Sequence, residues 1–175
     1  MGKPKSDIDF NLMSLTYRFR DFFLPRTDIL NEVGIKEGFH VLDYGCGPGS
    51  YLAPLAELVG KSGKIYTLDM HPLAIKRVQN IASKSQLTNI ETILSDRKTG
   101  LPDNSVDAVL LYDTFHDLSE PDRVLEELHR VLKPNGILSF SDHHMEDTEI
   151  VSKLTNRGLF RSSRKGRRTH TFLKG

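Results

Sequence analysis

The 175-residue sequence predicts an α/β fold, with a doubly wound, mostly parallel seven-stranded sheet that ends in a C-terminal antiparallel hairpin. Short apolar runs alternate with longer stretches of helical periodicity, which is typical of parallel strands joined by crossover helices. Several of the runs are followed at once by an acid, as expected where the carboxyl ends of strands form a ligand site. At this length we expect a single domain.

The N-terminal region, residues 1–34, predicts a helical segment that precedes the sheet. Apolar residues in 7–24 recur at near-helical spacing, which favours an amphipathic helix; they are Ile8, Leu12, Leu15, Phe19, Phe22 and Phe23. Pro25 ends this helix, and a second short helix is expected over 28–33. We interpret residues 1–34 as a lid over the remaining domain, residues 35–175.

The first half of the domain alternates three strands with two helices. Strands are expected over 39–43, 64–68 and 90–94, and helices over 50–59 and 72–84. Pro54 lies in or just past the first turn of its helix, and Pro72 opens the next, positions at which proline is tolerated. Gly60 and Gly63 separate the first helix from the following strand.

The second half begins with residues 106–112, a nearly continuous apolar run typical of a strand buried on both faces. Ser119 as a cap and Pro121 in the first turn open a helix, which the Lys-Pro-Asn-Gly run 133–136 ends. A strand over 137–141, a helix over 149–156, and a hairpin of 158–162 with 169–173 complete the chain. Strand order predicts a ligand site at the switch point between the first and fourth strands.

Charged residues are unevenly distributed. All 23 acids precede residue 150 and eight Lys/Arg lie from Lys153 onward, so residues 1–152 carry a formal charge of −7. The basic run 164–168 could bind RNA, but it is also typical of a solvated β-turn, which we favour. No apolar run approaches the roughly 18 residues of a membrane span, and the single Cys46 excludes an internal disulfide. We therefore expect a cytoplasmic protein that does not associate with membranes.

Residues 41–50 are the most informative segment, because a strand end, a glycine loop and a helix start follow one another. Asp43 precedes Gly45, Gly47 and Gly49, and Ser50 occupies the position where dinucleotide-binding loops carry their third glycine. This D-x-G-x-G-x-G pattern resembles motif I of the class I S-adenosylmethionine-dependent methyltransferases.

That resemblance implies a Rossmann-like methyltransferase fold and an S-adenosylmethionine-binding domain over 35–175. It implies that Asp43 holds the ammonium group of the cofactor. It also implies that the loop backbone contacts the methionine and ribose moieties, through Gly45, Cys46, Gly47 and Gly49. A glycine turn without a ligand is the alternative interpretation.

Two acids further along the chain match other positions of that family. Asp69, 20 residues after Gly49, is expected to accept hydrogen bonds from the ribose hydroxyls, unless it only stabilises the next helix start. Met70 is interpreted as an adenine contact or as a core methionine. Asp96 is expected to accept from the adenine amino group while the N–H of Arg97 donates to the ring; a turn-capping acid is the alternative.

The exit of strand 106–112 predicts the methionine end of the cofactor site. The backbone carbonyl of Tyr112 is the expected contact for the ammonium group. Tyr17, with Arg18 and Arg20, could close over the cofactor carboxylate or could form the solvated face of the N-terminal helix. Residues 101–118 and 128–138 resemble the type 11 small-molecule branch of the family.

Polar residues that should overhang the transferable methyl group follow two strands: Asp113, His116, Asp117, Asp142, His143 and His144. His116 is the candidate catalytic base, because the ordinary pKa of histidine lies near neutrality, and Asp113 is the candidate to orient the acceptor. Packing and capping roles are the alternatives. We assign no metal, although carboxylates suit hard cations and histidines suit zinc or another transition metal. Residues 142–144 point in different directions and cannot all bind one ion.

The sequence therefore predicts an S-adenosylmethionine-dependent methyltransferase that acts on a small-molecule acceptor and releases S-adenosylhomocysteine. One alternative is an RNA or protein methyltransferase that uses the basic hairpin. Another is a non-catalytic S-adenosylmethionine-binding protein. An NAD-dependent oxidoreductase is disfavoured by Asp43 and by Ser50.

Overall fold

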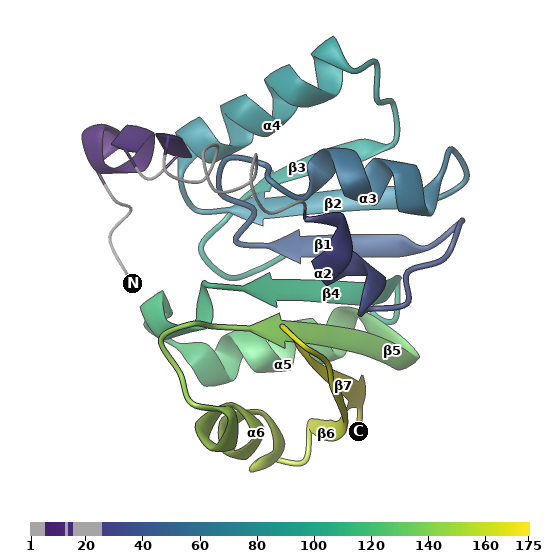
Figure 1. Cartoon of the computed structure of the whole chain (residues 1–175), viewed down its shortest axis with the longest axis vertical. Coiled ribbons are helices and arrows are strands. Elements are labelled where there is room, and N and C mark those ends of the chain that lie inside the picture. Colours follow the sequence, from purple (N-terminus) through teal and green to yellow (C-terminus); the bar gives the residue numbers. More distant parts are fainter. Residues whose placement is uncertain (1–5, 13, 16–25) are drawn as a thin grey trace.

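The computed structural model describes residues 6–12, 14–15 and 26–175, which contain one seven-stranded sheet of order β3-β2-β1-β4-β5-β7-β6 (Figure 1). The strands are β1 His40–Tyr44, β2 Lys64–Asp69, β3 Ile90–Leu94, β4 Val106–Tyr112, β5 Leu132–Ser141, β6 Phe160–Lys165 and β7 His170–Lys174. β3, β2, β1, β4 and β5 pair in parallel, whereas β7 runs antiparallel to both β5 and β6. The predicted doubly wound, mostly parallel sheet with a C-terminal hairpin is confirmed.

The strand order reverses between β1 and β4. Tyr44, at the end of β1, lies beside Leu68 of β2 and Leu111 of β4, so the loops that follow these three strands share one edge of the sheet. In open α/β sheets a ligand binds at this point, outside the carboxyl ends of the strands. The position of the switch point agrees with the sequence prediction.

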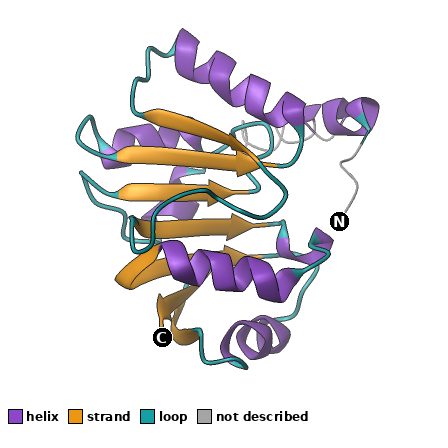
Figure 2. Cartoon of the chain, turned by 180° about the vertical axis from the view of Figure 1, so that it is seen from behind, coloured by secondary structure: helices purple, strands orange, loops and turns teal. Residues whose placement is uncertain are grey.

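Helices cover both faces of the sheet (Figures 1 and 2). One face carries α2 Thr27–Asn31, α3 Leu52–Val59 and α4 Pro72–Lys84, and the other carries α5 Pro121–Val131 and α6 Asp147–Thr155. A short 3₁₀ turn, η1 Phe115–Asp117, follows β4. Within β4, Leu110 packs into the core under α3 and Leu111 into the core under α5. Burial on both faces explains the continuous apolar run.

Two sequence predictions about α5 and β5 are wrong. Glu120, not Ser119, is the N-cap of α5, and its side chain makes no capping hydrogen bond. β5 begins directly after the helix at Leu132, five residues before the predicted start. The early start arises from pairing: Leu132 lies opposite Val106 of β4, and its carbonyl accepts from Lys174 Nζ at 2.7 Å. A register shift within β5 accommodates the residues expected to form a turn.

The N-terminal segment is helical over residues 7–12 and 14–15, but it buries a different face from the one predicted. Phe10 and Ser14 are buried, whereas Ile8, Leu12 and Leu15 are 81%, 66% and 63% exposed. Phe10 stacks on His71 at the site described below, and this contact determines which face of the segment is buried. The spacing of the aliphatic residues does not. Tyr17, Arg18 and Arg20, expected to reach the cofactor, lie outside the described residues.

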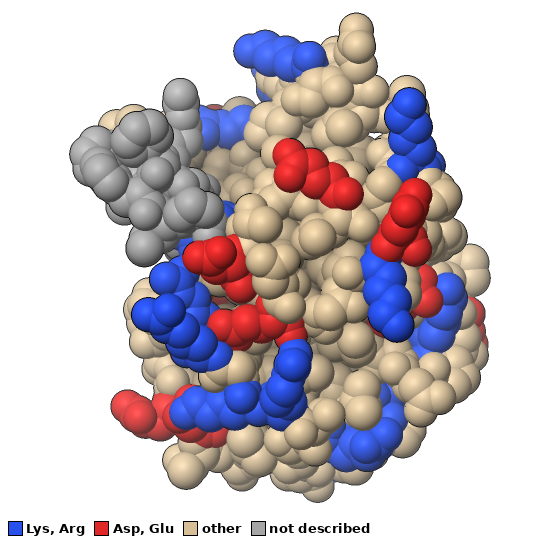
Figure 3. Space-filling model, turned by 45° about the vertical axis from the view of Figure 1, so that its right-hand side comes forward, with Lys and Arg blue, Asp and Glu red and all other residues tan. Residues whose placement is uncertain are grey.

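The basic C-terminal run forms the turn between β6 and β7, and acids from elsewhere in the chain contact it. Glu32, after α2, accepts hydrogen bonds from the N–H groups of Arg168 and Thr169 and from the Thr169 hydroxyl. Arg164 also donates to the Glu32 carbonyl, and Lys165 forms an ion pair with Asp147. Figure 3 shows acidic and basic side chains next to one another on the face it presents, with no broad basic surface there. The predicted β-turn is confirmed.

None of the helices in the described part of the chain is both long and apolar enough to cross a membrane.

Candidate cofactor and acceptor site

A cavity of about 250 Å³ lies at the switch point, at the carboxyl ends of β1, β2, β3 and β4. Its walls come from the loops after these strands and from the N-terminal segment. The lining residues are Phe10, Tyr44, Gly45, Cys46, Gly47, Pro48, Ser50, Tyr51, Leu68, Asp69, Met70, His71, Ser95, Asp96, Tyr112, Asp113, Thr114, Asp117 and Leu118.

The glycine loop is folded against the end of β2. The N–H groups of Gly45 and Cys46 both donate to the Leu68 carbonyl, at 2.8 and 3.0 Å. Gly45 has a φ of +79°, and a Cβ at this position would overlap the Thr114 hydroxyl. At Gly47, with φ of +51°, a Cβ would meet no atom within 4 Å. Gly47 also lines the cavity, so the loop needs glycine for its conformation and keeps this part of the wall free of a side chain.

Asp43 lies at the end of β1, buried beneath the loop, and it does not line the cavity. Its Oδ2 atom is buried and has no hydrogen-bond partner within the described part of the chain. Burial, together with the nearby negative charge of Asp69, raises the pKa of Asp43 to about 7. A buried carboxylate without a partner favours a cationic group nearby, which fits the ammonium and sulfonium charges of S-adenosylmethionine.

Asp69 ends β2 and is held rigidly by backbone groups. Its Oδ2 accepts from Gly47 N–H at 2.9 Å and its Oδ1 accepts from His71 N–H at 2.8 Å. Each carboxylate oxygen retains a second lone pair for a ligand hydroxyl. Burial raises the pKa of Asp69 despite these two hydrogen bonds. The fixed carboxylate is thus suited to accept from a ribose diol at the cavity wall.

His71 connects the cavity to the N-terminal segment, and sequence reasoning missed it. Its Nδ1 accepts from Leu73 N–H and caps α4, while Phe10 stacks on its ring at 4.4 Å between centroids. Its Nε2 lies 3.7 Å from an Asp7 carboxylate oxygen. The only signal in the sequence was its position just before Pro72, which marks a helix cap. Phe10 is therefore a wall of the cavity that the N-terminal segment contributes.

The adenine end of the predicted site is partly assembled. Met70 and the exposed Asp96 line the cavity, as expected for residues near a nucleobase. Arg97 does not line it: its N–H donates to Ser95 Oγ at 3.2 Å, and its side chain forms an ion pair with Glu120. Arg97 can donate its N–H to the adenine ring, as the sequence led us to expect, only if this N–H no longer donates to Ser95 Oγ.

The exit of β4 forms the opposite wall. The Tyr112 carbonyl, the expected ammonium contact, already accepts from the Thr114 hydroxyl at 2.9 Å and has a second lone pair. Asp113 lines the cavity with a φ of +48°, a conformation that costs a non-glycine residue about 1–3 kcal/mol. Its N–H donates to the Ser141 carbonyl at 2.7 Å, which ties the exits of β4 and β5 together.

His116 does not line the cavity, although Asp117 and Leu118 beside it do. Its Nδ1 lies 2.9 Å from Asp142 Oδ2, and its N–H donates to the same oxygen at 3.1 Å. Hydrogen bonds from His116 and from the His144 N–H hold the pKa of Asp142 below its usual range, although burial opposes this effect. The Nε2 atom of His116 lies 3.6 Å from a carboxylate oxygen of Asp117. The Asp142 contact fixes the ring, and sequence reasoning did not connect these two residues.

A methyltransferase-domain family model matches residues 35–168 of the chain. The demethylmenaquinone methyltransferase of Geobacillus stearothermophilus is 31% identical over 129 residues, which are 73% of this chain and 55% of that protein. The probable cobalt-precorrin-6B C(15)-methyltransferase (decarboxylating) of Thermoplasma volcanium is 37% identical over 126 residues, covering 67% and 63%. The chain thus spans little more than half the length of the curated relatives it matches.

A solved structure shows similarity to a methyltransferase over most of the chain. A SAM dependent methyltransferase from Aquifex aeolicus superposes with a TM-score of 0.75 and 32% sequence identity, covering 86% of this chain and 88% of that one. The family match over residues 35–168 includes the glycine loop and strands β1 to β6.

Proposed function

Because the chain belongs to the class I S-adenosylmethionine-dependent methyltransferases, we propose that it transfers a methyl group from S-adenosylmethionine to a small-molecule acceptor. The observation that carries this proposal is the cavity at the switch point, which the glycine loop and Asp69 line, with Asp43 buried beneath that loop. Relatives named for quinone and precorrin substrates support a small acceptor. The contacts of the basic turn with Glu32 and Asp147 leave little support for an RNA substrate.

The proposed cofactor contacts divide by the chemistry of each part of the ligand. Asp43 and the Tyr112 carbonyl favour the ammonium group, and Asp69 accepts from the ribose hydroxyls. The backbone of Gly45, Cys46, Gly47 and Gly49 is proposed to contact the methionine and ribose, although Gly49 faces Val78 and Ile81 of α4 and does not line the cavity. Met70, Asp96 and Arg97 are proposed for adenine and Tyr17 for the carboxylate. When bound, the cofactor supplies the methyl group as a sulfonium. The residues of the chain then orient the reactants and exclude water, which can contribute about 7–11 kcal/mol to lowering the barrier.

On the acceptor side we propose that His116 takes a proton from the acceptor and that Asp113 orients it. Asp142 holds the His116 ring through Nδ1, so Nε2, which lies 3.6 Å from an Asp117 oxygen, is the nitrogen that would take the proton. Asp117 lines the cavity and His116 does not, so the ring must approach the acceptor beside Asp117. A base is needed only where the acceptor atom carries a proton that must leave. His116→Ala should therefore slow transfer to a hydroxyl about 10²–10⁴-fold and leave transfer to a thiol near neutral pH largely intact.

Calorimetry and an acceptor screen test the proposal. S-adenosylmethionine should bind with one site per chain, and NAD should not bind. Small thiols, amines, phenols and quinones are then screened for release of S-adenosylhomocysteine. Binding of NAD in place of S-adenosylmethionine would contradict the proposed cofactor. Retention on immobilised RNA that weakens steeply with salt would favour the RNA alternative instead.

A further inference from the structure

Contacts on one side of the N-terminal helix fix its orientation. Phe10 stacks on the ring of His71, and the guanidinium carbon of Arg77 in α4 lies 5.3 Å from the centre of the Phe10 ring. Arg77 also donates to the Asn11 side chain at 2.7 Å. Phe10 and Ser14 are buried on this side, and Phe10 lines the cavity. The opposite side of the helix therefore faces outward.

The outward side carries an apolar stripe, which we define as Ile8, Leu12 and Leu15. All three side chains are mostly exposed. At about 3.6 residues per turn they lie within an arc of about 60°, roughly opposite Phe10. Among the described residues, Leu94 on β3 is the one other large apolar side chain of comparable exposure. The stripe is thus the place where exposed aliphatic side chains gather.

The sequence continues the pattern of the stripe. After Leu15, the same alternation of steps of four and three residues leads to Phe19 and Phe22. This spacing is typical of a helix with one apolar side. It is also the spacing of a coiled-coil seam, but residues 8–22 cover only about two heptads, and a coiled coil is indicated by about three to four. The pattern therefore gives little support for pairing with a second copy of the chain.

The shape of the surface favours a lipid partner. Figures 1 and 2 show the helix at the margin of the molecule, beyond the carboxyl ends of the strands. Stable protein partners each bury about 800 Å² over a complementary surface, which a ridge one helix wide does not offer. A bilayer needs no matching shape, because lipids pack around a helix that lies in the plane of the interface with its apolar side inserted.

The distribution of charge favours an anionic lipid surface. Residues 1–25 contain four Lys/Arg and three Asp, a formal charge of +1, whereas residues 26–152 carry −8. Asp7 and Asp9 lie outside the arc of the stripe and contact His71 and Ser6. Anionic headgroups attract a cationic segment of this kind and repel the acidic region that follows it. The cations lie on both sides of the stripe in the sequence: Lys3, Lys5, Arg18 and Arg20.

We propose that the apolar stripe docks the protein on the surface of an anionic lipid bilayer. The helix lies in the plane of the interface and does not cross it, so docking needs no apolar run of membrane-spanning length. The absence of membrane association expected from the sequence was based on the length of apolar runs, which does not test a helix of this kind. Because Phe10 on the opposite side lines the cavity, docking holds the cavity close to the lipid surface.

Cosedimentation with vesicles tests the proposal. The full chain is mixed with vesicles of phosphatidylcholine alone, or of phosphatidylcholine with about 30% phosphatidylglycerol. We expect binding to the anionic vesicles that weakens as salt is added, and weaker binding to phosphatidylcholine alone. Ile8→Ser combined with Leu15→Ser should weaken binding to the anionic vesicles at least about tenfold, because two aliphatic side chains no longer leave water. Both positions are exposed, so the double variant should fold, and circular dichroism checks this.

Leu94→Ser is the matched control, because it removes an aliphatic side chain that is 58% exposed but lies on β3, outside the stripe. Its binding to vesicles should equal that of the wild type. Failure of the wild type to bind anionic vesicles, or equal binding by the wild type and the double variant, would overturn the inference. Light scattering that finds a wild-type dimer and a monomeric double variant would instead show that a second copy covers the stripe.

Cofactor binding is measured separately, so that failure of docking and failure of the proposed function give different results. Neither Ile8 nor Leu15 lines the cavity. The double variant should therefore bind S-adenosylmethionine with the affinity of the wild type in the absence of vesicles.

Discussion

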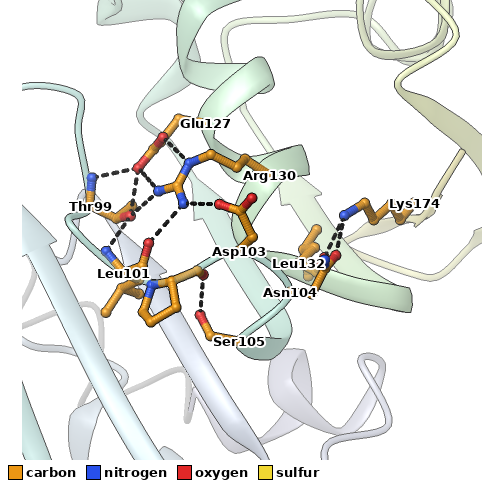
Figure 4. Close-up of polar contacts among 10 residues, drawn as sticks. Thr99, Leu101, Asp103, Asn104, Ser105, Glu127, Arg130, Leu132 and Lys174 are labelled. Carbon is orange, nitrogen blue, oxygen red and sulfur yellow. Dashed lines mark hydrogen bonds and ion pairs between the residues drawn. The ribbon is translucent and has the colours of Figure 1, made fainter.

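The network around Glu127 predicts a pH-dependent loss of stability in the variant Glu127→Gln. The Glu127 carboxylate accepts from the N–H and hydroxyl of Thr99, at 2.8 and 2.6 Å. It also accepts from Arg130 Nε and Nη2 at 2.9 and 2.8 Å (Figure 4). Its side chain is 13% exposed. These contacts tie the loop before β4 to α5.

The size of the expected stability loss in Glu127→Gln follows from the pKa of Glu127. Hydrogen bonds from Arg130 and Thr99 outweigh burial and lower this pKa from 4.5 to about 2. At 1.36 kcal/mol for each tenfold change in proton affinity, the lowering corresponds to about 3 kcal/mol. The Arg130 side chain is 36% exposed, which reduces this figure, and hydrogen bonds to charged groups contribute about 1.5–3 kcal/mol each. We therefore expect Glu127→Gln to lower the free energy of unfolding by about 1.5–3 kcal/mol at pH 7.

The sign of the pH dependence is fixed by the direction of the pKa change. A carboxylate with a lowered folded-state pKa stabilises the protein above pH 4.5, and this contribution is lost as the pH falls toward 2. Urea unfolding followed by circular dichroism between pH 7 and 3 measures the difference. Glu126→Gln, which removes an exposed ion pair with Arg157, is the control and should change the stability by less than about 1 kcal/mol. Equal stability of wild type and Glu127→Gln at pH 7, or a difference that does not shrink between pH 7 and 3, would refute the reasoning.

Three further predictions concern the cavity. Asp69→Ala should weaken S-adenosylmethionine binding at least about tenfold by calorimetry, because a charge-assisted hydrogen bond to the ribose is lost; unchanged affinity would remove Asp69 from the site. Gly45→Ala, which would overlap Thr114, should lower the melting temperature and abolish cofactor binding, whereas Gly158→Ala, also at positive φ but with open space, should lower the melting temperature only slightly. Asp43→Asn should raise the melting temperature of the cofactor-free protein at pH 8, because the folded state resists ionising a group with a pKa of about 7, and it should weaken cofactor binding. A lower melting temperature for this variant would show that the charge of Asp43 is satisfied within the protein.

Elements with strong local signals were predicted well from the sequence. α4 spans the predicted residues, because Pro72 marks its start and an apolar stripe at helical spacing continues to Lys84. β4 also matches, because burial on both faces leaves an uninterrupted apolar run. The glycine loop, Asp69 and Asp96 meet at one cavity because strand order alone places their strands side by side.

Features set by contacts between distant residues were not predictable in the same way. The early start of β5 depends on pairing with Val106 and on the contact with Lys174, and the local sequence reads as a turn. The buried face of the N-terminal segment depends on the stacking of Phe10 with His71. Likewise, the Asp142–His116 contact joins the ends of two strands, and sequence spacing does not determine the directions of these side chains.

The position of β7 has a consequence for how the chain is synthesised. β7 lies between β5 and β6, and the turn that precedes it is bound by Glu32, more than 130 residues earlier. Until residues 170–174 leave the ribosome, the hydrogen-bonding groups along one side of β5 have no partner strand. An open strand edge on a nascent chain is a site for aggregation or chaperone capture. Deleting residues 170–174 should therefore reduce solubility more than the removal of five residues suggests.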